Sequence, residues 1–272
     1  MPPTISVLLP AYNAQKYIGE AIQSILDQSF KDFEFIIVDD GSTDRTWSLV
    51  QEYAHDARIK ASQNARNLGL PATRNRLVAL AQAEYIAWQD ADDVSMPDRL
   101  ERQLEFMREH PEVGICGGAL QFFSARGAES VRKYASDDST LRRSIFRHSP
   151  VAHAAALIRR ECFEVTGLFP ETSPAAEDLA MSFQIGTKYK FGNVPDVVLK
   201  YRMNELGLTY SRLRTIELYT LFLRERYSHD PAYSMSWSDR AYNVIQHYLV
   251  YLMPTKLKIA LFNLLRNSRL YA

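Results

Sequence analysis

Short, mainly apolar segments alternate with helical patterns along residues 1–120, and this alternation constrains the fold more than any other feature of the chain. Such segments are typical of buried parallel strands. Between two of them, Ile18, Ile22 and Ile25 recur at helical spacing. Strand–helix–strand repetition predicts an α/β fold, a Rossmann-like and mostly parallel sheet flanked by helices. The expected strands are Ile5–Pro10, Phe33–Asp39, Ile59–Ser62, Tyr85–Gln89 and Val113–Gly118.

The pattern divides the chain into a main domain over residues 1–210 and a helical C-terminal region over residues 211–272. Within the main domain, residues 1–120 carry the alternation and residues 121–210 show weaker order. The polar segment Ser124–Ser149 is interpreted as connecting structure or a mobile loop.

Composition excludes several classes of function. Lys+Arg and Asp+Glu both number 32, so no global charge steers the chain to nucleic acid. Cys116 and Cys162 form no CxxC pair, and we expect two buried, reduced thiols. We find no signal peptide, and the apolar stretch Ala241–Thr255 is too short to span a bilayer. We expect a cytoplasmic protein, either free or peripheral on the inner face of the cell membrane.

Polar and acidic residues follow three of the expected strands. Tyr12 and Asn13 follow the first, Asp39–Asp44 follows the second, and Asp90–Asp93 follows the fourth. Ligands of parallel sheets bind beyond the carboxyl ends of the strands, so these groups should meet. Each segment could instead form a turn or a helix cap. Three carboxylates within four residues repel one another, however, and favour a hard cation, Mn²⁺ or Mg²⁺.

Arg74 is expected one turn inside a helix that Pro71 opens. From there it could reach a diphosphate. A solvated arginine on a helix face fits the local sequence equally well.

Several short motifs follow one another in a characteristic order. They are Pro10-x-Tyr12-Asn13, Asp39-Asp40-Gly41-Ser42-x-Asp44, Asn67-x-Gly69 with Arg74-Asn75, Asp90-Ala91-Asp92-Asp93, Gly167-Leu168-Phe169, Glu177-Asp178 and Tyr201-Arg202. In this order they resemble the family 2 glycosyltransferases over roughly residues 4–205. The resemblance implies an inverting enzyme of GT-A fold, in which residues 1–120 bind a nucleotide-sugar and residues 121–210 face the acceptor.

The resemblance implies that Tyr12 flanks the base, that Asp39 contacts base or ribose, and that Arg74 approaches the diphosphate. Asp90 would face ribose or metal, and Asp92 would be the main ligand of Mn²⁺ or Mg²⁺. Such a cation offsets the charge that develops on the departing diphosphate. The implied donor-binding residues are Pro10, Tyr12, Asp39, Asn67, Arg74 and Asp90, and the implied metal ligands are Asp92 and Asp90.

The resemblance assigns the catalytic base to Asp178, in an acidic pair expected to open a helix. Inversion requires a base that deprotonates the acceptor hydroxyl as its oxygen attacks the anomeric carbon. The pair could instead merely complement the helix dipole. Glu177, His153, Arg202 and Asn204 form the expected acceptor-side or supporting set, and Asn204 stands where family members often carry a histidine.

We therefore predict hexosyl or N-acetylhexosaminyl transfer from a nucleotide diphosphate-sugar, with UDP favoured. The acceptor would be a hydroxyl of a saccharide or lipid-linked saccharide in polysaccharide, lipopolysaccharide or other glycoconjugate assembly. The segment Thr255–Arg269 sets leucines among basic residues. It would either touch an anionic membrane surface or pack on the catalytic domain or a second subunit.

Three alternatives compete with this hypothesis. A haloacid dehalogenase-type phosphatase would use Asp90 as its nucleophile, but its motif normally ends the first strand rather than the fourth. A non-catalytic nucleotide-sugar-binding protein would not need Asp92 and Asp178. A sugar nucleotidyltransferase should carry a glycine-rich phosphate loop after the first strand, and Pro10–Asn13 is not one.

Overall fold

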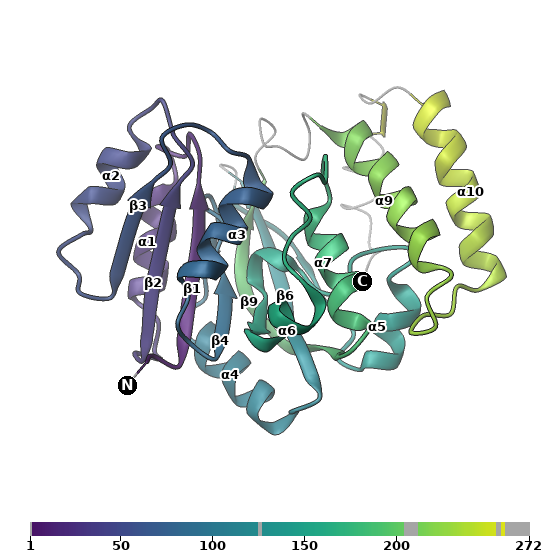
Figure 1. Cartoon of the computed structure of the whole chain (residues 1–272), viewed down its shortest axis with the longest axis horizontal. Coiled ribbons are helices and arrows are strands. Elements are labelled where there is room, and N and C mark those ends of the chain that lie inside the picture. Colours follow the sequence, from purple (N-terminus) through teal and green to yellow (C-terminus); the bar gives the residue numbers. More distant parts are fainter. Residues whose placement is uncertain (1, 125–126, 204–211, 254–256, 259–272) are drawn as a thin grey trace.

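The computed structural model describes residues 2–124, 127–203, 212–253 and 257–258, and its elements are labelled in Figure 1. Nine strands among these residues form one sheet in the order β3-β2-β1-β4-β8-β6-β9-β5, with β7 paired to β6. The strands are β1 (Ile5–Ala11), β2 (Phe33–Asp39), β3 (Ile59–Gln63), β4 (Tyr85–Trp88), β5 (Val94–Ser95), β6 (Val113–Ser124), β7 (Gly127–Arg132), β8 (Leu157–Arg159) and β9 (Lys190–Arg202).

The sheet is mostly parallel, as predicted. In the N-terminal half of the sheet, β1 lies in the middle and pairs in parallel with β2 on one side and with β4 on the other. β6 and β9 are also parallel to each other, whereas β5, β7 and β8 run antiparallel to their neighbours. All seven residues of β1 and of β2 are buried, which explains why their sequences are so apolar.

Helices cover both faces of the sheet (Figure 1). One hydrophobic core joins α1, α2 and α4 to one face, and a second joins α3, α5, α6, α7 and α9 to the other. The helices are α1 (Ile18–Leu26), α2 (Thr46–Glu52), α3 (Leu70–Leu80), α4 (Arg99–Glu109), α5 (Asp138–Ser144), α6 (Glu161–Thr166), α7 (Glu177–Gly186), α9 (Leu213–Tyr227) and α10 (Trp237–Leu252), with a 3-10 turn, η1 (His153–Ala155). Cys116 and Cys162 are buried and free, as expected.

The interpretation of Ser124–Ser149 as a loop is wrong. The segment contains β7, which forms a hairpin with β6, and α5, whose first turn is capped by Asp137 accepting from the Thr140 backbone N–H at 2.9 Å. Only Leu141 of α5 is buried. A helix with one buried residue leaves no apolar periodicity in the sequence, so its pattern looks like that of a loop.

The described part of the C-terminal region is helical, as predicted. α9 packs on α7, where the rings of Phe183 and Tyr227 stack with centroids 4.6 Å apart. α10 begins with a capping box formed by Ser236 and Asp239. None of the helices in the described ranges is long and apolar enough to cross a membrane. The division at residue 210 stays a prediction.

Candidate active site

The sheet register brings the ends of three strands together. Ala11 of β1 lies beside Asp39 of β2, and Leu8 of β1 lies beside Trp88 of β4. The segment after β4, here named the carboxylate loop (Asp90–Asp93), therefore starts at the same edge of the sheet as the turn after β2. This is the edge towards which the arrowheads of β1 and β2 point in Figure 1.

Asp39 is fully buried, and both of its carboxylate oxygens are engaged. Oδ1 accepts from the Ser42 backbone N–H at 2.9 Å and from the Ser42 hydroxyl at 2.6 Å, while Oδ2 accepts from Gln63 at 3.1 Å. Pro10 is buried in β1, whereas the ring of Tyr12, just beyond the strand, is 48% exposed. The turn is thus built around Asp39, and Tyr12 presents an open aromatic surface next to it.

Asp40, for which the sequence predicted no individual role, holds the next loop in place. Its Oδ1 accepts from the Asn64 side chain at 2.7 Å and from the Leu68 backbone at 2.9 Å, and its Oδ2 accepts from the Gly69 backbone at 2.9 Å. Asn67 lies exposed on this loop. Asp40 therefore fixes the entry to α3, which carries Arg74. The pair Asp39-Asp40 at the end of β2 is the sequence feature that could have identified this role.

Arg74 is only 4% exposed and joins two acidic sites from opposite halves of the chain. Its Nη1 donates to Glu177 Oε1 at 2.9 Å, and its Nη2 lies 3.7 Å from Asp90 Oδ1. The guanidinium also lies 5.4 Å from the ring centroids of both Trp88 and Phe169. Arg74 is not a solvated surface residue; its cation sits between the carboxylate loop and the start of α7.

The carboxylate loop is held from both sides by side chains. Gln89 Nε2 donates to the carbonyl oxygens of Asp90 and Asp93 at 3.0 and 2.9 Å. From β9, Arg202 Nε donates to the Asp92 carbonyl at 2.8 Å, and the Arg202 backbone N–H donates to Asp93 Oδ1 at 2.8 Å. Arg202 therefore holds the loop backbone from β9, and its acceptor-side or supporting role stays a prediction.

Arg99 lies fully buried beneath this loop, and no sequence pattern predicted a role for it. It donates to the Trp88 carbonyl at 2.7 Å, to Ser95 Oγ at 2.8 Å and to Gln89 Oε1 at 3.2 Å, while Gln103 accepts from its Nε at 3.1 Å. Burial lowers the pKa of Arg99 to about 10, and it remains a cation at neutral pH. Its position in the sequence shortly after Asp90–Asp93 is the feature that could have identified it.

The loop concentrates negative charge in a poorly solvated place. Burial, and then the charges of Asp92 and Glu177, raise the pKa of Asp90, although Arg74 opposes the shift. Burial and the two neighbouring aspartates raise the pKa of Asp93 well above its usual range. Asp93 Oδ2 has no hydrogen-bond partner among the described residues. This excess of carboxylate oxygens fits a hard divalent cation.

The described residues contain no group of three His, Cys, Asp or Glu side chains arranged to hold a metal by themselves. Mg²⁺ and Mn²⁺ sites that serve nucleotides commonly combine one or two carboxylates with phosphate oxygens of the substrate. Asp90 and Asp92 fit such a site.

Asp178, in the first turn of α7, has the pKa of a carboxyl that can exchange protons near neutrality. Burial, and then the charge of Glu177, raise the pKa of Asp178 to about 6, while Arg74 opposes the shift. The partly buried Tyr134 and Tyr201 have raised pKa values, first through desolvation and then through nearby carboxylates, which include Asp178 for both and the carboxylate loop for Tyr201. Such a carboxyl is suited to general base catalysis.

His153 is buried in η1 against the rings of Trp88 and Phe169, whose centroids lie 5.6 and 5.5 Å from its own. Neither ring nitrogen has a hydrogen-bond partner among the described residues. Burial and the nearby charge of Arg74 lower the pKa of His153 well below its usual range, so its ring is neutral. Asn204 lies outside the described residues.

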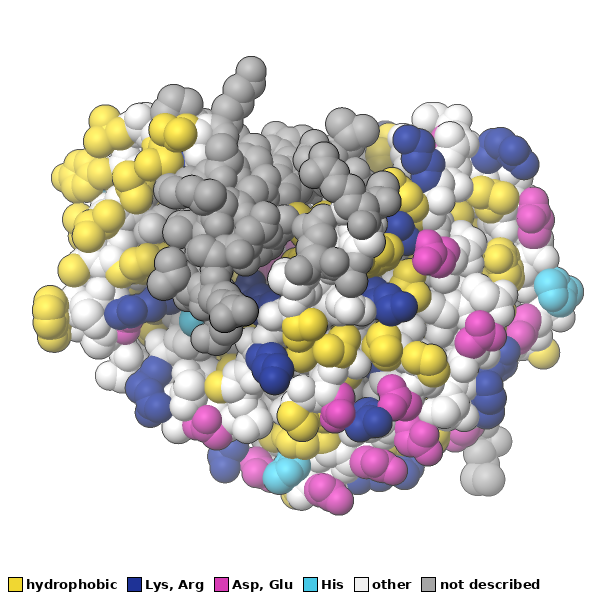
Figure 2. Space-filling model, turned by 180° about the vertical axis from the view of Figure 1, so that it is seen from behind, with side chains coloured by type: hydrophobic (Ala, Val, Ile, Leu, Met, Phe, Trp, Pro, Cys, Tyr) yellow, Lys and Arg dark blue, Asp and Glu magenta, His cyan; other side chains and the backbone are white. Residues whose placement is uncertain are grey.

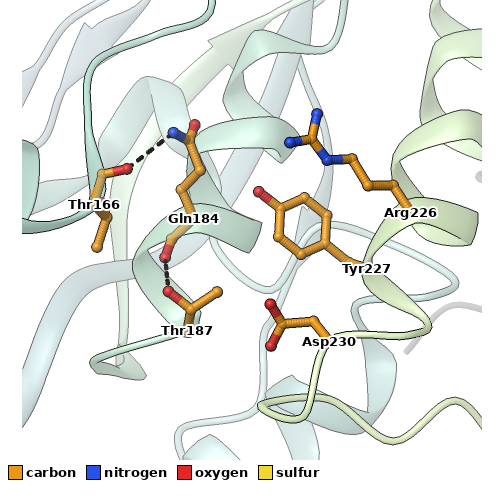
Figure 3. A pocket seen from close by; sticks show the side chains of 6 residues that line it. All are labelled: Thr166, Gln184, Thr187, Arg226, Tyr227 and Asp230. Carbon is orange, nitrogen blue, oxygen red and sulfur yellow. Dashed lines mark hydrogen bonds between the residues drawn. The ribbon is translucent and has the colours of Figure 1, made fainter.

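A separate pocket of about 350 Å³ lies between α7 and α9 (Figure 3). None of the predicted site residues lines it, and it adjoins the second half of α7, away from Asp178 in the first turn. Its lining residues are Thr166, Gln184, Thr187, Arg226, Tyr227 and Asp230.

Several known proteins are similar to this chain in sequence or in fold. The uncharacterized glycosyltransferase MJ1057 of Methanocaldococcus jannaschii is 27% identical over 264 residues, 93% of this chain and 90% of that protein. The mannosyltransferase PcManGT from Pyrobaculum calidifontis, solved in complex with GDP-Man and Mn²⁺, has a TM-score of 0.64 at 20% identity, covering 100% of this chain and 82% of that one. S. aureus TarS 1–349 in complex with UDP-GlcNAc has a TM-score of 0.62 at 24% identity, covering 80% of this chain and 66% of that one.

The two solved structures support the GT-A fold, and the family assignment rests on the sequence. The family model described as Glycosyl transferase family 2 matches residues 6–167, more than half of the chain. This match spans the turn after β2, Arg74 and the carboxylate loop, and it removes the haloacid dehalogenase alternative. The chain is a glycosyltransferase and belongs to family 2.

Proposed function

We propose that the protein transfers a hexosyl or N-acetylhexosaminyl group from a UDP-sugar to an acceptor hydroxyl with inversion at the anomeric carbon. The observation that carries this proposal is the Asp90–Arg74–Glu177 chain of contacts. It connects a carboxylate loop suited to a cation and a diphosphate with Asp178, a carboxyl whose pKa is raised to about 6. Leaving-group stabilisation and proton removal would thus occur at two ends of one ionic network.

The donor would lie along the strand ends. Tyr12 would stack on the base, and Asp39 would contact base or ribose from the end of β2, with Pro10 and Asn67 lining the same edge. Arg74 would face the diphosphate. The UDP-GlcNAc complex of TarS and the GDP-Man complex of PcManGT support a nucleotide-sugar, and the first favours UDP.

Asp92 and Asp90 would hold a divalent cation, Mn²⁺ or Mg²⁺, together with phosphate oxygens. The cation, when bound, neutralises charge on the leaving diphosphate. The Mn²⁺ in the PcManGT complex supports this assignment. Gln89 and Arg202, which hold the backbone of the loop, would keep both carboxylates in place.

Asp178 would act as the base. Its carboxylate would accept the proton of the acceptor hydroxyl while that oxygen forms a bond to the anomeric carbon and the bond from that carbon to the diphosphate oxygen breaks. The products are the glycosylated acceptor, UDP and protonated Asp178, which then loses its proton to solvent. Glu177, His153, Arg202 and Asn204 would support the acceptor side. The acceptor would be a saccharide or lipid-linked saccharide of a growing glycoconjugate.

A donor panel tests the proposal. Thermal shifts are measured with UDP- and GDP-linked hexoses and N-acetylhexosamines, each with and without Mn²⁺. We expect one UDP-sugar to stabilise the protein most and to do so only with the cation. Preference for a GDP-sugar, or stabilisation that ignores Mn²⁺, would contradict the donor or metal assignment respectively.

The base assignment needs its own test. We expect Asp178→Asn to bind UDP as tightly as the unaltered enzyme and to lose transfer by about a thousandfold, since general base catalysis supplies about that factor. The anomeric configuration of the product, read by NMR, decides between inversion and retention. Normal transfer by Asp178→Asn would refute the role of this residue.

A further inference from the structure

α10 turns an apolar face to solvent. Trp237, at its first position, is 82% exposed and Leu252, at its last, is 77% exposed. Four further large apolar side chains between them are each more than half exposed: Val244, Ile245, Tyr248 and Tyr251. Each of the six lies three, four or seven residues from at least one other, which places them on one side of the helix. Figure 2 shows hydrophobic side chains gathered at its upper left, over the edge of the molecule where α10 lies.

The opposite face of α10 is fixed to the body of the protein by polar contacts. Asp239 accepts from Arg147 Nε at 2.6 Å. Asn243 donates to the Phe146 carbonyl at 3.0 Å and accepts from Arg224 Nη1 at 3.1 Å. Turning the helix to bury its apolar side would break all three of these bonds. The outward direction of the apolar face is therefore built into the fold.

The chemistry of this face matches a lipid surface that carries negative charge. Asp239 is the single acidic residue of α10, and it is buried on the inner side. Arg240 is exposed among the apolar residues, and Arg214 of α9 lies 5.3 Å from the Tyr251 ring centroid. Exposed tryptophan and tyrosine with aliphatic neighbours and arginine are the composition that settles at the boundary between headgroups and acyl chains.

We propose that α10 is a membrane-docking helix, which lies in the surface of an anionic bilayer with its Trp237–Leu252 face buried among the headgroups. The size of the exposed face of α10 favours a membrane over a second copy of the chain as the surface that covers it. A helix of 16 residues is about 24 Å long and about 10 Å wide, so its face covers roughly 240 Å². A stable dimer buries about 800 Å² on each partner, whereas an interfacial helix needs only its own face.

The sequence predicts membrane contact farther along the chain than α10. That prediction rested on Thr255–Arg269, of which only residues 257–258 belong to the described part. α10 precedes that segment and supports docking through its own exposed side chains. The inference does not depend on the proposed donor, metal or base.

Vesicle flotation of the full-length protein tests the proposal. We expect the protein to float with vesicles of phosphatidylcholine mixed with phosphatidylglycerol, and less with phosphatidylcholine alone. The double variant Ile245→Glu/Tyr248→Glu should weaken partitioning at least about tenfold, because burial of one large apolar side chain is worth about that factor. Sugar transfer to a soluble acceptor should stay unchanged, which separates this test from that of the proposed function.

A matched pair of single variants controls for the loss of exposed apolar surface. Val244 on α10 and Val165 on α6 are both 55% exposed. Val244→Glu should reduce flotation, and Val165→Glu should leave it unchanged. Equal effects of the two, or undiminished flotation of the double variant, would overturn the proposal.

Trp237 provides a readout within the folded protein. Its fluorescence should shift to shorter wavelength on addition of anionic vesicles and be quenched by brominated lipid, and Trp237→Phe should remove this quenching. Absence of quenching would refute docking through α10. A change from dimer to monomer in the double variant, measured by analytical ultracentrifugation, together with no vesicle binding, would show instead that a second copy covers the face.

Discussion

Arg74 Nη1 donates to Glu177 Oε1 at 2.9 Å, and this bond joins residues that are 103 positions apart in the chain. The same guanidinium lies 3.7 Å from Asp90. The buried guanidinium of Arg74 thus lies close to a carboxylate of the carboxylate loop and pairs with Glu177 at the start of α7. Because Arg74 also lowers the pKa of Asp178, it connects the charge of the carboxylate loop with the proton affinity of the proposed base.

Replacement of Arg74 by methionine should therefore shift the pH dependence of transfer. Without the cation, the pKa of Asp178 rises further, and the acid limb of kcat/KM should move to higher pH. The unpaired carboxylates should also lower the free energy of unfolding by about 3 kcal/mol, which denaturant titration would detect. Arg74→Lys, which retains the charge, should keep the limb near its original position. An unmoved limb in Arg74→Met would show that Arg74 does not tune the base.

Transfer by the unaltered enzyme should fall as pH falls through about 6, the value to which burial and Glu177 raise the pKa of Asp178. Below that pH the carboxyl is protonated and cannot accept the hydroxyl proton, so the rate should drop about tenfold per pH unit.

The effect of the same proton on the stability of the fold has the opposite sign. The folded state binds the proton more tightly than the unfolded state, so the free energy of unfolding should decrease as pH rises from about 4 to about 6.

Asp178→Asn isolates that contribution. Since the amide does not ionise, the variant should lose this part of the decrease in stability between these pH values, although Asp90 and Asp93, whose pKa values are also raised, still contribute. Thermal unfolding at several pH values measures the difference. Identical stability profiles of the two proteins would mean that Asp178 has an ordinary pKa.

Asp92→Asn should weaken binding of UDP in the presence of Mn²⁺ by more than about tenfold and leave the weaker, metal-free binding unchanged. Isothermal titration with and without the ion separates the two. Asp98→Asn is a suitable control, because Asp98 lies just beyond the loop and pairs with Arg102 on α4. Equal losses in the two variants, or a loss that persists without Mn²⁺, would exclude Asp92 as a metal ligand.

The sequence predicted the sheet and its acidic edge because both leave local signals. Buried parallel strands are continuous apolar runs, and polar residues directly after them must lie at one edge. Tyr12, Asp39 and the carboxylate loop could therefore be placed before the structure was known. The segment Ser124–Ser149 could not, because β7 depends on pairing with β6 and α5 has a single buried residue.

Buried polar residues left no such signal. Arg99 and Gln89 are polar residues at fully buried positions, and a periodic pattern treats a polar residue as exposed. Arg74 could be proposed from its helix, but its bond to Glu177 depends on how α3 and α7 pack. On sequence alone, His153 could be an acceptor-side residue or a structural one; the structure packs it against two aromatic rings, with a neutral imidazole.

Arg99 offers the sharpest test of how the carboxylate loop is positioned. Arg99→Met retains most of the side-chain volume but leaves the Trp88 carbonyl, Gln89 Oε1 and Ser95 Oγ without this donor. Leaving these buried acceptors without their donor should lower the free energy of unfolding by about 3 kcal/mol. Because Arg99 also lowers the pKa of Asp90, the acid limit of Mn²⁺-dependent UDP binding should move to higher pH.

The pH limit distinguishes a positioning residue from one that only stabilises the fold. Arg99→Lys, which keeps the charge, should restore the limit even where its shorter side chain leaves the protein less stable. Arg102→Met, a change of the exposed arginine on the same helix, should alter neither the stability nor the pH limit appreciably. If Arg99→Met is destabilised but binds UDP with an unchanged pH limit, the buried cation supports the fold and has no influence on the charge of the loop.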